Sequence, residues 1–392
     1  MNRTFRDFGV GHVNPPISDS AMYEFATGAE MTEMFETGIA GRYLYGRHLS
    51  PSNHLLAQDL AVLEGTESAC VMATGMGAIS CVVMQICQSG DEIVASRTVY
   101  GGTYALFANL LPRFGVKTHF VNMNDLDEVK RNLTPRTKAL YCETLSNPLL
   151  ACPDLSALSK LCQDRGIKLV VDNTFTPLIV RPIQLGADVV VHSLTKYING
   201  MGDHLGGAVC GTQEFISSML DVNTGSSMLL GPTMDAQVSA SIRKNLQTLP
   251  LRVKQHSQNA LTVARRLQEN GYSVVYPGLA SHPDHERFAT MSDSAYGSGA
   301  VFTLDCRDRE TADLFMQELV RQGIGHLAVS LGFVQTLFSM PACSTSSEIP
   351  EEERKRMGLS TGFVRFSVGV EPDSDALASA IVSVAKKEIT GS

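Results

Sequence analysis

The residues with the clearest chemical potential lie where an apolar run stops. The segment "DVVVHSLTKY", residues 188–197, passes from consecutive valines into Ser193, Thr195 and Lys196. A lysine crowded by apolar residues has a lowered pKa and can attack a carbonyl. Residues at alternate positions of a strand point to the same side, so both hydroxyls can face one ligand. The segment therefore predicts a nucleophilic amine beside two donors for an anion.

A glycine turn earlier in the chain predicts a phosphate-binding site. The string "ATGMGAIS", residues 73–80, places Gly75 and Gly77 between a β-like run and an amphipathic run. Free backbone N–H groups and the positive end of a helix dipole bind anions at such a turn. The dinucleotide-binding pattern needs glycine where Ser80 stands, so a nicotinamide site is the less favoured interpretation.

Three further residues suit a flat, protonated ring. Tyr100 lies beside Gly101 and Gly102, where an aromatic side chain either stacks on a cofactor or covers a loop. Asp172 ends the apolar run "IKLVVD", where a buried carboxylate needs a charged or protonated partner. That partner is either a protein group or the nitrogen of a protonated heterocycle. Asn147, in "SNP", offers a further hydrogen-bond donor.

These groups together meet the needs of one cofactor. A phosphate seat, an acid for a ring nitrogen, a stacking aromatic and a lysine that attacks an aldehyde match pyridoxal 5′-phosphate (PLP). In an open α/β sheet, ligands bind beyond the carboxyl ends of the strands. The elements of the fold must therefore bring these residues to one edge of a sheet.

The pattern between residues 51 and 247 is that of such a sheet. Asn53 is expected to cap a first helix and Gly65 to end it. Short β-rich runs then alternate with helical segments, which indicates a mostly parallel sheet with helices on both faces. One of these helices is expected over 103–113. The expected strands are 68–73, 91–96, 116–121, 137–143, 167–172 and 188–193.

The two flanks of this region differ from it. Residues 1–50 contain little periodicity and cannot form a core alone, so we expect an arm that lies across something else. Residues 248–392 have charged helices and fewer strands, which favours a smaller C-terminal α/β domain.

Composition excludes several classes of protein. The formal net charge of -8 and the lack of basic runs argue against a nucleic-acid partner. The nine cysteines show no C-x-x-C spacing, so we expect no disulfide framework and a cytoplasmic location. Residues 69–87 carry no charge but are interrupted by glycines and polar residues, so we expect no membrane span. His282 and His285 lack a third ligand nearby, and no metal is expected.

A resemblance to a known family adds to these inferences. Over about residues 10–385 the chain resembles the Cys/Met-metabolism PLP enzymes related to cystathionine γ-synthase, most closely methionine γ-lyases of the plant type. This implies the PLP-dependent transferase fold type I, with a mostly parallel seven-stranded sheet and a smaller C-terminal domain. Seven motifs carry the resemblance in the family's order: "YLYGRHLSPSNHLL", "ATGMGAI", "YGGTYALF", "VDNTF", "VHSLTKY", "AVSLG" and "FVRFSVGVE".

The resemblance implies a role for each matching residue of the cofactor site. Lys196 would bind the cofactor covalently and move protons, and Asp172 would pair with its ring nitrogen. Tyr100 would stack on the ring and assist elimination, and Asn147 would lie near the ring 3′-oxygen. The phosphate would be bound by the Gly75 and Met76 amides and by the hydroxyls of Ser193 and Thr195.

The resemblance also implies groups for the substrate and for a second subunit. Arg365 would bind the substrate carboxylate, with Ser330 and Asn147 nearby. Tyr45 and Arg47 would reach into the phosphate site of a neighbouring subunit, so the arm would complete another chain's site. A homotetramer, a dimer of catalytic dimers, is expected.

The implied reaction is α,γ-elimination of L-methionine to methanethiol, 2-oxobutanoate and ammonia. Gly102 is a departure, because the bacterial methionine γ-lyases carry a reactive cysteine there. Cystathionine γ-lyase, cystathionine γ-synthase and O-acetylhomoserine sulfhydrylase activities stay open, as does a different class, a nicotinamide-binding protein or catalytically idle scaffold. Cys343, close to the expected carboxylate site, either faces the substrate or is buried.

Overall fold

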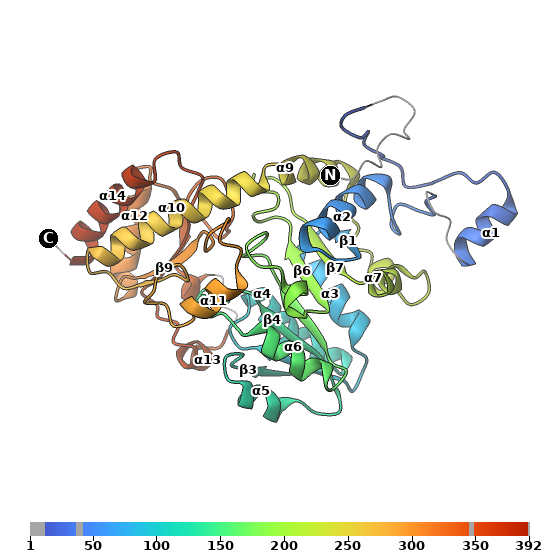
Figure 1. The fold of residues 1–392 in the computed structure, drawn as a ribbon, viewed down its shortest axis with the longest axis horizontal. Helices are drawn as coiled ribbons and strands as arrows, with labels where there is room; N and C mark the ends of the chain where they lie inside the picture. The colour runs from blue at the N-terminus through green and yellow to red at the C-terminus, as the bar shows by residue number, and fades with distance from the viewer. Residues whose placement is uncertain (1–11, 37–41, 345–348, 391–392) are drawn as a thin grey trace.

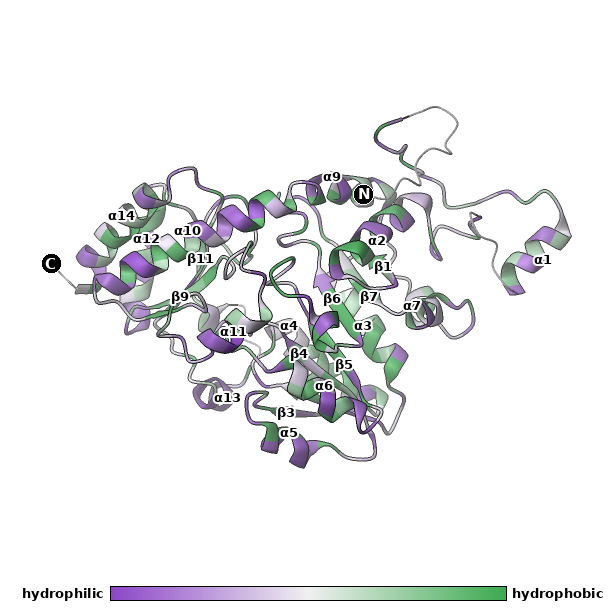
Figure 2. Cartoon of the chain, in the orientation of Figure 1, coloured by the Kyte–Doolittle hydropathy of each residue, from purple (hydrophilic) through white to green (hydrophobic). Residues whose placement is uncertain are grey.

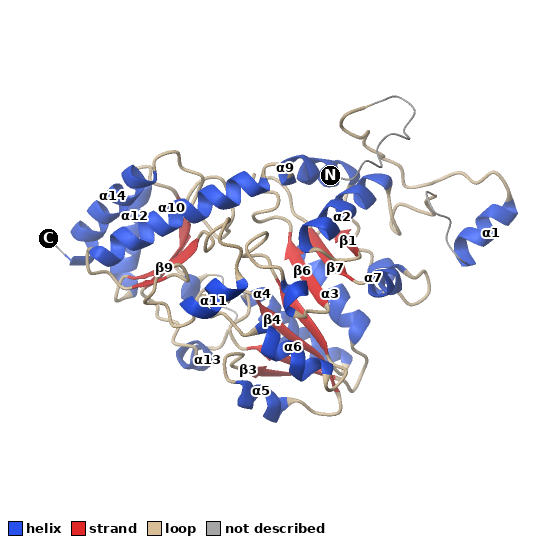
Figure 3. Ribbon diagram, viewed as in Figure 1, coloured by secondary structure: helices blue, strands red, loops and turns tan. Residues whose placement is uncertain are grey.

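The computed structural model describes residues 12–36, 42–344 and 349–390, and it contains two β-sheets (Figure 1). Helices cover both sheets, and loops connect the layers (Figure 3). Within the described part of the chain, no helix has the length and apolar character needed to cross a membrane.

The larger sheet has seven strands in the order β1-β7-β6-β5-β4-β2-β3. All of its pairs from β6 through β5, β4 and β2 to β3 are parallel, whereas β7 runs antiparallel to both neighbours. The mostly parallel seven-stranded sheet is therefore confirmed. The strands are β1 (Ser68–Met72), β2 (Glu92–Ser96), β3 (Lys117–Val121), β4 (Thr137–Glu143), β5 (Lys168–Asp172), β6 (Val189–Ser193) and β7 (Gly207–Gly211).

Apolar side chains cover both faces of this sheet, as its continuous apolar strands predict. On β5, Leu169 and Val171 join one buried cluster with α2 and α6, whereas Val170 joins the cluster on the opposite face with α3. The largely hydrophobic character of α3 is visible in Figure 2. The helices around this sheet are α2 (Pro51–Glu64), α3 (Gly75–Ile86), α4 (Gly101–Ala105), α5 (Leu126–Asn132), α6 (Leu155–Gln163), α7 (Gln213–Leu220), α8 (Ser226–Leu230) and α9 (Ala236–Leu246).

Three local expectations need correction. The cap of α2 is Ser50, whose hydroxyl accepts the N–H of Asn53. The Asn53 side chain instead donates to the Met234 carbonyl, and Gly65 does end this helix.

The helix expected over 103–113 is α4, followed by a π-turn and a 3₁₀-turn, because Pro112 supplies no N–H for regular α-helical bonding. Strand β7 was not expected, since its glycine-flanked sequence resembles a loop.

The smaller sheet has five strands in the order β10-β11-β12-β9-β8, and only its β10–β11 pair is parallel. Helices α10 (Leu249–Glu269), α12 (Arg309–Arg321) and α14 (Ser374–Ala385) share one buried hydrophobic cluster with this sheet. Helices α11 (His285–Met291) and α13 (Glu351–Arg356) lie in its connections (Figure 1). The strands are β8 (Val274–Val275), β9 (Val301–Asp305), β10 (His326–Leu327), β11 (Leu337–Ser339) and β12 (Phe363–Ser367).

One polar stripe of α10 joins the two sheets. Arg252 is buried and donates to the carbonyl oxygens of Tyr197 and Ile198, which directly follow Lys196. One and two turns further along, His256 donates to the Val368 carbonyl and Asn259 to those of Gly369 and Glu371, just after β12. The loop that follows Lys196 and the end of β12 are thus held by the same helix.

We predict that Arg252→Met lowers the free energy of unfolding by about 3 kcal/mol, because it leaves buried carbonyl oxygens without donors. The urea midpoint measured by circular dichroism checks this. Arg265→Met, an exposed change on the same helix, is the control and should shift stability by less than about 0.5 kcal/mol. Equal midpoints for the two variants would contradict the assigned role of Arg252.

Candidate active site

A cavity of about 290 Å³ lies at the carboxyl ends of the parallel strands, where ligands bind in such sheets. Apart from Tyr45 and Arg47, every site residue expected from the sequence lines it. These are Gly75, Met76, Tyr100, Asn147, Asp172, Ser193, Thr195, Lys196, Ser330 and Arg365.

The amino end of α3 forms one wall of this cavity and has the features of a phosphate seat. Thr74 caps the helix by accepting the Gly77 N–H at 2.9 Å, which leaves the earlier N–H groups of the helix facing outward. A Cβ at Gly75 would lie 2.9 Å from the Cβ of Ser193, so only glycine lets the helix approach β6 this closely. The cradle fits an anion bound by backbone amides.

Lys196 follows β6 and is removed from bulk water. Its Nζ donates to the Ser330 hydroxyl at 2.9 Å. Burial, with a smaller contribution from the nearby charge of Arg365, lowers the pKa of Lys196 to about 8. A larger fraction of this amine than of an ordinary lysine is therefore neutral and nucleophilic near neutral pH. Ser330, expected near the substrate, contacts the lysine itself.

Asp172 ends β5 with neutral hydrogen-bond partners. Its Oδ1 accepts the Thr174 N–H at 2.9 Å and its Oδ2 accepts the Tyr141 hydroxyl at 3.2 Å. Burial raises the pKa of this carboxyl. Among the described residues no basic side chain forms an ion pair with Asp172, although the carboxylate lines the cavity. A cationic ring nitrogen fits this position because it would supply the missing charge.

Arg365 on β12 brings a second cation to the cavity. Its Nη1 donates to Asn147 Oδ1 at 2.9 Å and its Nη2 to the Ser330 carbonyl at 3.0 Å. Burial lowers the pKa of this guanidinium to about 10, and among the described residues its Nε has no hydrogen-bond partner. The neutral partners leave the charge free to bind a carboxylate.

Tyr100 stands at the cavity mouth and is partly exposed. A Cβ at Gly102 would lie 2.6 Å from Cε1 of the Tyr100 ring. The ring could not keep its position beside any side chain at residue 102. The absence of a side chain at Gly102 therefore allows the Tyr100 ring to occupy this position.

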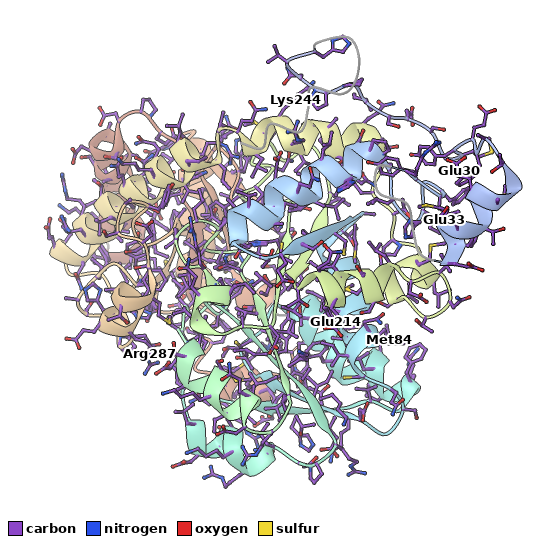
Figure 4. All side chains as sticks on the ribbon, turned by 45° about the vertical axis from the view of Figure 1, so that its right-hand side comes forward. Glu30, Glu33, Met84, Glu214, Lys244 and Arg287 are labelled. Atoms are coloured by element: carbon purple, nitrogen blue, oxygen red, sulfur yellow. The ribbon has the colours of Figure 1, made fainter. Side chains whose placement is uncertain are left out.

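Two expected residues, Tyr45 and Arg47, lie outside the cavity of their own chain. Arg47 donates to the Met228 carbonyl, and its guanidinium lies 5.9 Å from the centre of the Tyr45 ring. Both precede α2 in the chain, as does helix α1 (Gly28–Glu36), which lies apart from both sheets (Figure 1). Figure 4 shows Glu30 and Glu33 on that helix; Glu30 pairs with Arg42 at 2.7 Å.

Sequence reasoning missed the groups that support the strand ends. Glu64 on α2 lies 2.7 Å from Nε2 of the buried His192 and also accepts from the Asn173 amide, which fastens β6 to the end of β5. Tyr141 and Glu143 on β4 contact the site as well. A polar residue within an aliphatic strand is the signal that could have indicated them.

Cys343, expected to face the substrate or be buried, is exposed and outside the cavity.

Comparison with known proteins identifies the family. The family model described as Cys/Met metabolism PLP-dependent enzyme matches residues 2–380. A relative, "Methionine gamma-lyase" of Arabidopsis thaliana, is 41% identical over 371 residues, which are 93% of this chain and 84% of the relative.

Two solved structures share the fold. The cystathionine gamma synthase of Xanthomonas oryzae pv. oryzae, in complex with aminoacrylate and cysteine, has a TM-score of 0.89 at 32% identity, covering 98% of this chain and 96% of its own. A Campylobacter jejuni protein described as an O-acetylhomoserine (thiol)-lyase, with N′-pyridoxyl-lysine-5′-monophosphate, has a TM-score of 0.88 at 28% identity, covering 96% of both chains. This chain therefore belongs to the Cys/Met metabolism PLP-dependent enzymes of fold type I, and it is a PLP-dependent carbon–sulfur lyase.

Proposed function

We propose that the enzyme catalyses α,γ-elimination of L-methionine and related thioethers. The observation that carries this choice is the apolar part of the cavity wall, formed by Leu145, Phe175, Leu205 and Val329. A methylthio group suits such a wall, whereas a second amino-acid head group would need charged partners. The similarity to the Arabidopsis protein supports the same substrate.

Different residues around the cavity would bind different parts of PLP. Lys196 would hold its aldehyde carbon and Asp172 its ring nitrogen, with Tyr100 against the ring face and Asn147 near the 3′-oxygen. When bound, PLP supplies an electron sink that stabilises negative charge at carbons next to the amino group. Its phosphate would be bound by the Gly75 and Met76 amides, Ser193 and Thr195.

The chain's own residues orient the substrate and move protons. Arg365 would bind the substrate carboxylate through its charged guanidinium. The Lys196 amine, with its pKa near 8, would take the proton from the α-carbon. Tyr100 would donate a proton from its hydroxyl to the departing sulfur as the Cγ–S bond breaks. The balanced reaction converts methionine and water into 2-oxobutanoate, ammonia and methanethiol.

Cystathionine γ-lyase, cystathionine γ-synthase and O-acetylhomoserine sulfhydrylase activities are the second candidates. They use the same groups at the α-carbon and differ in the leaving group or nucleophile. The similarity to the Xanthomonas and Campylobacter structures supports these activities as alternatives.

We also propose the assembly and organisation expected from the sequence. Residues 51–247 and 248–392 would be two domains, because each has its own sheet and one buried cluster consists of residues of the second domain alone. Residues 1–50 would be an arm that brings Tyr45 and Arg47 to the phosphate of a neighbouring subunit in a homotetramer. Its exposed apolar side chains, among them Met22 at 76% exposure, support such a contact. The nine free thiols suit a reducing cytoplasm.

The proposed specificity is tested by comparing kcat/KM for methionine, homocysteine, cystathionine and O-acetylhomoserine from the rate of 2-oxo acid release. We expect methionine to exceed cystathionine by about tenfold or more, since an unpaired second head group costs at least about 1.4 kcal/mol. Lys196→Ala is the control for background release. A preference for cystathionine would reject methionine as the substrate.

The lowered pKa of Lys196 predicts a pH dependence for covalent attachment of PLP to the cofactor-free protein. Only the neutral amine attacks, so the rate should rise with pH and reach half its maximum near pH 8. Arg365→Gln removes a neighbouring positive charge and should move this midpoint upward. Borohydride trapping followed by mass spectrometry measures the rate. A midpoint that stays above pH 10 in the wild-type protein contradicts the assignment.

If each active site combines residues of two subunits, mixing two inactive variants should restore activity. Arg47→Ala and Lys196→Ala damage different components of one site, so random reassembly after mild dissociation should restore about one site in four. Lys196→Ala mixed with Asp172→Ala is the matched control, because both defects lie in the same chain's cavity and no intact site can form. Recovery in neither mixture, with normal assembly by light scattering, would reject the exchange of arms.

A further inference from the structure

Glu143 is a buried carboxylate that the proposed chemistry leaves without a role. It ends β4, lines the cavity and is 7% exposed. Its Oε1 accepts the Tyr100 N–H at 2.7 Å, and its Oε2 accepts the Asn147 N–H at 3.1 Å. One carboxylate therefore binds the backbone of two site residues that are 47 positions apart in sequence.

The two segments held by Glu143 carry different parts of the site. Tyr100 immediately precedes α4, and no side chain caps that helix. Asn147 accepts a hydrogen bond from Arg365 Nη1 at 2.9 Å through its Oδ1. Glu143 is thus connected directly to the stacking aromatic residue and, through Asn147, to the arginine that faces the substrate.

Burial of the Glu143 carboxyl group in its ionised form carries a free-energy cost. Glu143 lies opposite Asp172 in the β4–β5 register, and burial together with that neighbouring charge raises its pKa well above the usual range. No basic side chain forms an ion pair with it among the described residues. The two backbone N–H bonds offset part of this cost, because hydrogen bonds to a charged acceptor are the strong ones.

We propose that Glu143 is a positioning residue whose two oxygens set the distance between Tyr100 and Asn147. The carboxyl group of Glu143 presents two oxygens, and each accepts a backbone N–H here, whereas glutamine replaces one of these oxygens with an NH₂ donor. In a glutamine variant, one of the two N–H groups would face an N–H donor and its segment would move. The inference rests on the proposed roles of Tyr100, Asn147 and Arg365.

The test compares Glu143→Gln with Asp284→Asn in the assembled protein. Asp284 is also buried and also accepts a backbone N–H, from Cys152 at 2.9 Å, but it does not line the cavity. We expect Glu143→Gln to lower kcat/KM about tenfold to a hundredfold, since a misplacement of about 1 Å costs this much. Asp284→Asn should stay within about twofold.

Two measurements separate positioning from a general loss of structure. The cofactor-free Glu143→Gln protein should bind PLP about tenfold more weakly, because the stacking ring is displaced. At saturating PLP its cofactor circular-dichroism band should also shrink, while Asp284→Asn keeps both properties. Thermal unfolding of the two variants identifies a folding defect. If Glu143→Gln misfolds, Glu143→Asp replaces it, because the shorter side chain keeps the carboxyl group but cannot reach both N–H groups.

Double variants decide between this inference and the proposed function. If Glu143 acts through Tyr100, the Glu143→Gln loss should be smaller in a Tyr100→Phe background than in the wild-type protein. Equal losses in both backgrounds, or unchanged cofactor affinity and dichroism, would overturn the positioning role. If Tyr100→Phe and Asn147→Ala alone leave kcat/KM unchanged, the proposed roles of those residues fail instead.

Discussion

Four ionisable side chains are held away from water around one cavity, and each lacks a direct ion-pair partner among the described residues. Lys196 and Arg365 have lowered pKa values, and Asp172 and Glu143 have raised ones, with burial as the largest cause in every case. Burying a charge is expensive unless other groups satisfy it. The neutral donors and acceptors around them hold these groups in place at the cavity wall.

The sheet makes this arrangement possible because its parallel strands end at the same edge. Asp172 and Ser193 end neighbouring strands, and the amino end of α3 comes within van der Waals contact of Ser193 because Gly75 has no side chain. On the other face, Glu64 forms hydrogen bonds with His192 and with the Asn173 side-chain amide, and these bonds hold the ends of β6 and β5 together. The residues that line the cavity at these strand ends are thus held by strands that are supported on both faces.

The second sheet contributes one buried cation, Arg365, to this edge. Arg365 extends from β12 into a cavity otherwise built largely by the first sheet. Its position depends on Asn147 and on α10, whose polar stripe binds both the loop after Lys196 and the end of β12. A shift between the two sheets would therefore change the distance between Lys196 and Arg365.

Local sequence was sufficient for those features that depend on residues close together in the chain. The continuous valines before Lys196 predict a buried strand, and the glycines from residue 75 predict a turn that opens a helix, because hydrophobic burial and backbone freedom are local properties. The helix cap at Ser50 and strand β7 were missed, since competing cap residues and glycine-flanked strands look alike locally. Motif resemblance, rather than periodicity, led to Arg365.

Only the tertiary structure decided how distant residues act on one another. It brought Ser330 to the Lys196 amine, placed the Tyr100 ring against Gly102, and made Glu143 a bridge between two site segments. No local pattern contains these contacts, because each joins residues from different elements through side-chain geometry. The sequence by itself determined which chemical groups stand at the strand ends; the packing of the sheets and helices determined their pKa values, their partners and the shape of the space between them.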